Sequence, residues 1–142
     1  MITANKGERE EDAARQVQTN RFHRILVVDD ETAVRTLITA VLVGCGYHVD
    51  SAENGAVAWE ALQATPYDLL ITDQNMPKIT GVELVKSLRS AHMALPVVMV
   101  SGNLPAEELA QNPSLELAAT ILKPFRIAEL LDTVSYALQI AE

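Results

Sequence analysis

The hydrophobic pattern of this chain changes its period repeatedly from residue 24 onward, and this alternation limits the folds open to it. Short, continuously apolar runs rich in β-branched residues alternate with segments whose apolar residues recur every three or four positions. The runs are expected to be strands buried on both faces, and the periodic segments to be helices. Five such strands alternating with five helices are typical of a parallel α/β sheet with helices on both sides.

The sequence gives clear boundaries for the expected strands and helices. The strands are predicted at residues 25–28, 47–52, 68–72, 96–100 and 120–122. Apolar positions of the helices span residues 34–42, 57–62, 82–88, 105–109 and 127–138. Gly44 is expected to end the first helix, and the spacing of Thr80 and Glu83 predicts a capping box that opens the third.

The first part of the chain differs in composition from the rest. Residues 1–22 are polar, with only scattered apolar positions, so they are expected to form a marginal helix at most. We predict a flexible N-terminal arm over 1–22 and one domain over 23–142. The total of 142 residues suits this division, because a domain usually spans roughly 100–200 residues.

Charge and hydropathy argue against several classes of function. The formal net charge is −8, and all of it falls in 23–142, because residues 1–22 carry equal numbers of acidic and basic side chains. A domain this acidic is repelled by phosphate backbones, so no nucleic-acid partner is expected. No apolar run approaches the roughly 18 residues of a membrane helix, and the N-terminal segment is charged where a secretory signal is apolar. We therefore expect no membrane insertion and a cytoplasmic location.

Polar side chains follow four of the predicted strands at the point where each strand ends. Asp29 and Asp30 follow the first strand, Asp73 the third, Ser101 the fourth and Lys123 the fifth. In an open parallel sheet, ligands bind beyond the carboxyl ends of the strands. We expect these five side chains to meet at one edge of the sheet.

The chemistry of these residue types favours a magnesium site and phosphoryl transfer. Two carboxylates about 4 Å apart repel by roughly 4 kcal/mol at an effective dielectric of 20, so three of them need a cation. Mg²⁺ prefers oxygen ligands, and the main chain near Asn75 could add a carbonyl. A carboxylate is ordinarily ionised at neutral pH, so an aspartate such as Asp73 can act as a nucleophile without a general base. Lys123 would then supply positive charge and Ser101 a hydroxyl donor to the transferred group.

Four segments together resemble the receiver domain of the two-component response-regulator family. They are residues 25–31, 68–77 with Gly81, 96–102 and 122–125. The resemblance covers about 23–142 and implies a flavodoxin-like, doubly wound five-stranded parallel sheet with five helices and the strand order 2-1-3-4-5. It also implies a stand-alone phosphoacceptor rather than an enzyme, and a cis Lys123-Pro124 peptide.

The resemblance assigns roles to the candidate site residues. Asp73 would accept a phosphoryl group from a histidine kinase or a histidine phosphotransfer protein, with Lys123 and Ser101 assisting. Asp30, Asp73 and the Asn75 carbonyl would ligate Mg²⁺, and Asp29 would act through water. The phosphorylated protein would signal by passing the group along a relay or by changing its affinity for another protein.

One departure from the family pattern keeps two alternatives open. Receiver domains commonly carry Tyr or Phe three residues before the lysine, whereas this chain has Thr120. A phosphorylation-independent adaptor is therefore one alternative. The other is a Mg²⁺-dependent phosphatase that forms an aspartyl phosphate, although the residue two positions after Asp73 is Asn75 rather than a second acid that could serve as general acid.

Overall fold

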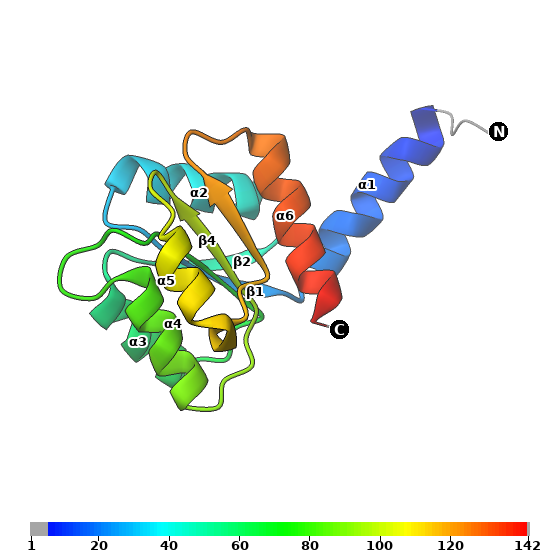
Figure 1. Ribbon diagram of the computed structural model, residues 1–142. Helices are drawn as coiled ribbons and strands as arrows, with labels where there is room; N and C mark the ends of the chain where they lie inside the picture. The colour runs from blue at the N-terminus through cyan, green and yellow to red at the C-terminus, as the bar shows by residue number, and fades with distance from the viewer. Residues whose placement is uncertain (1–5, 142) are drawn as a thin grey trace.

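A five-stranded parallel sheet forms the centre of the computed structural model, which describes residues 6–141 (Figure 1). The strands lie in the order β2-β1-β3-β4-β5, and every neighbouring pair is parallel. Their bounds are β1 Arg24–Val28, β2 His48–Ala52, β3 Leu69–Thr72, β4 Val97–Ser101 and β5 Ala119–Leu122. The predicted fold class and strand order are confirmed.

Within residues 6–141, six α-helices and one 3-10 turn precede, connect or follow these strands. Their bounds are α1 Lys6–Asn20, α2 Thr32–Gly44, α3 Gly55–Ala64, α4 Gly81–Ser90, α5 Ala106–Gln111, η1 Pro113–Leu115 and α6 Ile127–Ile140. The predicted number of five helices is one too low, because α1 was not counted. This helix buries so little apolar surface that the sequence shows no strong helical period there. No helix within residues 6–141 is long and apolar enough to cross a membrane.

The sheet has apolar side chains on both faces, as a parallel sheet between two helical layers requires. Helices α2 and α6 cover one face, and α3 and α4 cover the other. The first core includes Ile25, Val27, Ile38, Leu42, Ile71, Val98, Leu130 and Val134. The second includes Leu26, Val28, Ala58, Leu62, Leu70, Val85, Leu88 and Met99. Burial of one such large side chain contributes about 1.5–3 kcal/mol, so these two layers stabilise the sheet.

Helix α1 is anchored to the domain at its C-terminal end. Residues 10–19 are exposed, and Figure 1 shows the helix projecting from the body of the molecule. Asn20, by contrast, is buried and donates a 2.8 Å hydrogen bond from Nδ2 to the carbonyl oxygen of Cys45. Gln16 donates from Nε2 to Oδ1 of Asn20 at 2.7 Å. The predicted arm is therefore helical over 6–20, residues 1–5 lie outside the described part, and the flexibility of 1–22 stays a prediction.

The close approach of α1 to Gly46 leads to a testable expectation. Gly46 has φ +98°, and a Cβ placed there would lie 2.4 Å from the carbonyl oxygen of Val17. We expect Gly46→Ala to lower the free energy of unfolding by about 1–2 kcal/mol and to release the last turn of α1. Urea denaturation measures the first effect, and limited trypsin cleavage after Arg21 measures the second. Gly44→Ala is the control, because nothing lies within 4 Å of its Cβ position. Equal behaviour of the two variants would contradict the expectation.

Strand register brings the carboxyl ends of the central strands together. Val28 of β1 pairs with Thr72 of β3, and Ser101 of β4 pairs with Leu122 of β5. The residues that follow these strands are therefore neighbours, although they are far apart in the sequence. The backbone N–H of Asp73 donates to the carbonyl oxygen of Val28 at 2.9 Å, which fixes the first residue beyond β3 against the end of β1.

Candidate functional site

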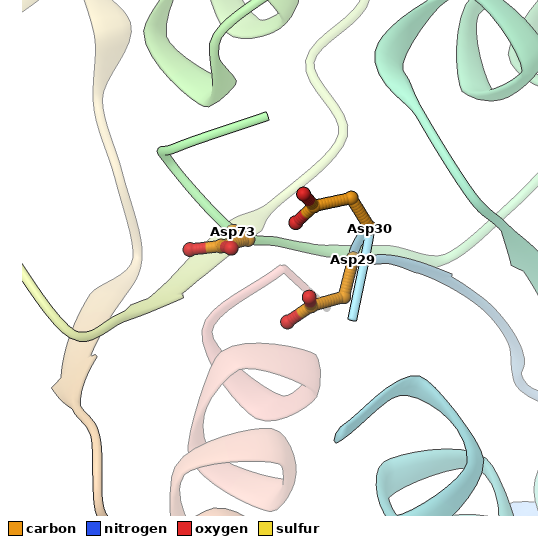
Figure 2. Close-up of side chains that lie close together, drawn as sticks. All are labelled: Asp29, Asp30 and Asp73. Carbon is orange, nitrogen blue, oxygen red and sulfur yellow. The ribbon is translucent and has the colours of Figure 1, made fainter. Parts of the chain in front are cut away.

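Three aspartate side chains lie close together at this edge of the sheet (Figure 2). Asp29 and Asp30 follow β1, and Asp73 follows β3. Each offers one carboxylate oxygen such that all three oxygens lie within 4.8 Å of one another. Asp29 and Asp73 are buried, with exposed fractions of 2% and 4%, whereas Asp30 is exposed. The arrangement is a small acidic site with one solvent-facing member.

Lys123 supplies the positive charge of this site. Its Nζ lies 2.9 Å from Oδ2 of Asp29 and 3.5 Å from Oδ2 of Asp73. A third carboxylate oxygen, Oε1 of Glu31, lies 3.4 Å from the same Nζ. The Lys123 side chain is mostly buried, so water screens these interactions less than it would at the surface. Lys123 therefore links the ends of β1 and β3 from a position beyond β5.

For both Asp29 and Lys123, burial and the groups bonded to the side chain shift the pKa in opposite directions. Burial raises the pKa of Asp29, and the hydrogen bonds from Lys123 and from the backbone N–H of Glu31 offset only part of that effect. Burial also disfavours the charged form of Lys123. The hydrogen bond to Asp29 and the charges of Asp29, Asp73 and Glu31 together outweigh this effect of burial. They raise the Lys123 pKa above its ordinary value. Lys123 is therefore protonated at neutral pH.

The carboxylate of Asp73 has a defined orientation. Its Oδ1 accepts a 2.8 Å hydrogen bond from the backbone N–H of Gln74, while its Oδ2 is the oxygen nearest to Lys123. The hydroxyl of Thr72 donates to the carbonyl oxygen of Asp73 at 2.8 Å. Both the side chain and the peptide of Asp73 are thus held by neighbouring groups, and one carboxylate oxygen faces the lysine.

The structure also places the remaining predicted residues. Ser101 is the last residue of β4 and is buried, and its carbonyl oxygen accepts a 2.9 Å hydrogen bond from the backbone N–H of Lys123. Asn75 is exposed in the loop between β3 and α4, and its carbonyl as a metal ligand stays a prediction. Thr120 is exposed on β5 at the edge of the sheet. The Lys123-Pro124 peptide is cis, as the resemblance implies.

Three residues of the site were not singled out from the sequence. Glu31 is a second acidic partner of Lys123, and its position directly after two aspartates was the available signal. Arg35 of α2 donates from a guanidinium nitrogen to the carbonyl oxygen of Asp29 at 2.7 Å. Gln74 holds the phosphoacceptor candidate and the start of α4, and nothing in its sequence context distinguishes it from an ordinary turn residue.

The donor set fits a divalent cation. The ligand atoms offered by Asp29, Asp30 and Asp73 are carboxylate oxygens, and Mg²⁺ prefers oxygen ligands. Four carboxyl groups, those of Asp29, Asp30, Glu31 and Asp73, accompany one ammonium group, so the formal charge of the site is negative and favours a divalent cation. The exposed position of Asp30 leaves room for the water ligands that Mg²⁺ usually retains.

The fold and the acidic site together define a receiver-type α/β domain. The family model of the response regulator receiver domain matches residues 25–135. The chain therefore belongs to the response-regulator receiver family, whose members act in two-component signalling. The predicted family is confirmed.

Individual relatives and solved structures agree with this assignment. The response regulator receiver protein CpdR of Brucella abortus is 32% identical over 114 residues, which span 78% of this chain and 92% of CpdR. The chemotaxis response regulator CheY4 of Vibrio cholerae has a TM-score of 0.73 and 30% identity, covering 81% of this chain and 98% of that chain. The response regulator TrrA of Thermotoga maritima, solved in complex with Mg²⁺-BeF, has the same TM-score, identity and coverage.

Other relatives are much longer than the matched region. The match spans 49% of the transcriptional regulatory protein CusR and 10% of the sensor protein EvgS, both of Escherichia coli. The receiver domain thus occurs among these relatives both nearly alone and as part of larger proteins.

Proposed function

We propose that this chain is a response-regulator receiver domain that accepts a phosphoryl group on Asp73 from a histidine kinase or a histidine phosphotransfer protein. One observation carries the proposal. The Oδ1 of Asp73 is held by a backbone N–H, while its Oδ2 lies 3.5 Å from the Lys123 ammonium group beside two further aspartates. This is the arrangement that a carboxylate nucleophile and an incoming phosphoryl group require.

The transfer forms one bond and breaks another. The Oδ2 of Asp73 attacks the phosphorus of a phosphohistidine, the P–O bond forms and the P–N bond breaks. The electron pair remains on the imidazole nitrogen of the donor, which takes up a proton. Lys123 then balances charge on the phosphoryl oxygens, and the Ser101 hydroxyl donates a hydrogen bond to one of them. The chain acts as a phosphoacceptor in this step and not as a turnover enzyme.

The metal would be held by the acidic side chains of the same edge. Asp30, Asp73 and the Asn75 carbonyl are the proposed direct ligands, and Asp29 is proposed to act through water. Mg²⁺, when bound, supplies positive charge to the equatorial phosphoryl oxygens. Asp29 and Asp73 are buried, so water screens their attraction to such a charge less than it would at the surface. The cytoplasmic location proposed for the chain suits a donor of this kind.

Phosphorylation with a small phosphodonor tests the proposal. We expect the wild-type protein, incubated with Mg²⁺ and acetyl phosphate, to gain one phosphoryl group in intact-mass spectra. Asp73→Asn keeps the shape of the side chain but removes the nucleophilic carboxylate, so we expect no adduct. Absence of an adduct on the wild type, or an equal adduct on the variant, would contradict the proposal. Profiling against histidine kinases and phosphotransfer proteins of the source organism then identifies the donor.

A phosphorylation-independent adaptor is the second candidate, and Thr120 is the observation that favours it. The residue is small and exposed on the edge strand β5, so it does not offer the aromatic ring that usually reports phosphorylation in this family. The adaptor predicts equal affinity for a partner in the presence and absence of a beryllofluoride phosphoryl mimic. A change of affinity with the mimic favours the phosphorylation-dependent function instead.

A further inference from the structure

Gln74 uses three of its polar groups to connect Asp73 with the first turn of α4. Its backbone N–H donates to Oδ1 of Asp73 at 2.8 Å. Its carbonyl oxygen accepts from the backbone N–H of Gly81 at 3.0 Å, and its side-chain Oε1 accepts from the backbone N–H of Val82 at 2.8 Å. The side chain is buried, with 6% exposed. One residue therefore contacts both the phosphoacceptor carboxylate and a helix.

The N–H groups in the first turn of α4 depend largely on Gln74 for their hydrogen-bond acceptors. The N–H groups of Gly81, Val82 and Glu83 have no carbonyl partner inside the helix. Gln74 accepts from the first two, and the Thr80 hydroxyl accepts from the third at 3.2 Å. Gln74 and Thr80 therefore share the capping of this helix, but only Gln74 is also bonded to Asp73.

These contacts restrain the backbone torsions of Gln74, whose N–H and carbonyl groups belong to successive peptide units. With its carbonyl oxygen and its side chain both bonded to α4, the residue cannot rotate without breaking two hydrogen bonds. Its N–H group is then directed at Oδ1 of Asp73, which leaves Oδ2 toward Lys123. A correctly oriented reacting group lowers the barrier because no reorientation is needed during the reaction.

We propose that Gln74 is a positioning residue for phosphoryl transfer, which holds the Asp73 carboxylate in its reactive orientation by bonding to the start of α4. The proposal rests on the proposed phosphoacceptor function. It extends that function to a residue whose side chain is bonded to α4 rather than to Asp73.

The test compares two variants that each remove one cap of α4. Gln74→Met removes the acceptor of Val82 N–H while keeping the length of the side chain. Thr80→Ala removes the acceptor of the Glu83 N–H group, a bond that does not involve Asp73. Both substitutions are expected to destabilise α4 by similar amounts, because each removes one cap. Urea denaturation checks that the two variants have similar stability. The first readout is the rate of phosphorylation by acetyl phosphate at saturating Mg²⁺.

We expect Gln74→Met to lower this rate about five- to tenfold, because the carboxylate must now be oriented during the reaction. We expect Thr80→Ala to stay within about twofold of wild type, since its effect is limited to the helix. Equal rates for Gln74→Met and wild type, or equally reduced rates for both variants, would overturn the proposal.

A second readout does not depend on phosphorylation. The hydrogen-exchange rate of the backbone N–H of residue 74, followed by NMR, reports the bond to Oδ1 of Asp73. We expect exchange to be faster in Gln74→Met than in wild type and unchanged in Thr80→Ala. If the wild type accepts no phosphoryl group, the proposed function fails, and this exchange rate still decides whether Gln74 orients Asp73. Unchanged exchange in Gln74→Met would rule that role out.

Discussion

Replacement of Lys123 by methionine is expected to abolish efficient phosphorylation and, in the same protein, to strengthen Mg²⁺ binding. The lysine ammonium group lies 2.9 Å from Asp29 and 3.5 Å from Asp73, so it competes with any cation for these carboxylates. Removing it increases the negative potential at the site, and we expect the Mg²⁺ dissociation constant to fall at least about tenfold. The phosphorylation rate falls because no ammonium group balances charge on the transferred phosphoryl group. Calorimetric Mg²⁺ titration and phosphodonor kinetics measure the two opposite effects.

The same variant is expected to be less stable without Mg²⁺. Loss of Lys123 leaves two buried carboxylates without their cationic partner, which costs about 3 kcal/mol of the free energy of unfolding. The deficit also depends on pH. Burial already raises the pKa of Asp29, and the lost hydrogen bond from Lys123 raises it further. A carboxyl group with a raised pKa in the folded state lowers stability as pH rises through that pKa, so the deficit is present above it and shrinks in acid.

Urea denaturation at about pH 5 and pH 7.5, with and without Mg²⁺, measures these effects. Mg²⁺ is expected to restore much of the lost stability, since it binds only the folded state. Lys86→Met is the matched control, because it makes the same substitution at an exposed position of α4. A surface change of this kind is expected to alter stability by about 0.5 kcal/mol or less. Unchanged Mg²⁺ affinity in Lys123→Met would refute the proposed competition.

Substitution of Gly81 by alanine is expected to disturb both stability and the phosphoacceptor. A Cβ at this first residue of α4 would lie 2.3 Å from the carbonyl oxygen of Asp73 and 3.1 Å from Cα of Gln74. These are backbone atoms that cannot rotate away, so α4 or the loop after β3 must shift. We expect a loss of about 2–3 kcal/mol and a phosphorylation rate lowered about tenfold or more.

Thermal or urea denaturation measures the stability of Gly81→Ala, and intact-mass kinetics measure its phosphorylation. Gly102→Ala is the matched control, because it places a methyl group in the loop that follows Ser101, where nothing lies within 4 Å of the Cβ position. We expect the control to keep its stability within about 0.5 kcal/mol of wild type. A Gly81→Ala protein as stable and as reactive as the control would show that the loop gives way at little cost.

The pattern of apolar residues was sufficient to predict most of the fold. The continuously apolar runs of β1, β3 and β4 are typical of strands covered on both faces, and the observed strand bounds differ from the predicted ones by at most one residue. The strand order came from the resemblance of the motifs to a known family. Helix α1 was missed as a separate element because its residues 10–19 face water, and exposed helices leave little periodicity in a sequence.

The sequence by itself determined which residue types stand at the ends of the strands, because each buried strand ends where its apolar run meets the first polar residue. It therefore indicated Asp29, Asp30, Asp73, Ser101 and Lys123 as one candidate site. Only the tertiary structure decided how these groups share their partners. The competition of Asp29 and Glu31 for Lys123 and the bonds that Gln74 accepts from Gly81 and Val82 of α4 depend on distances across separate elements. Local residue patterns do not contain such distances, because they arise only when the strands and α4 are packed together.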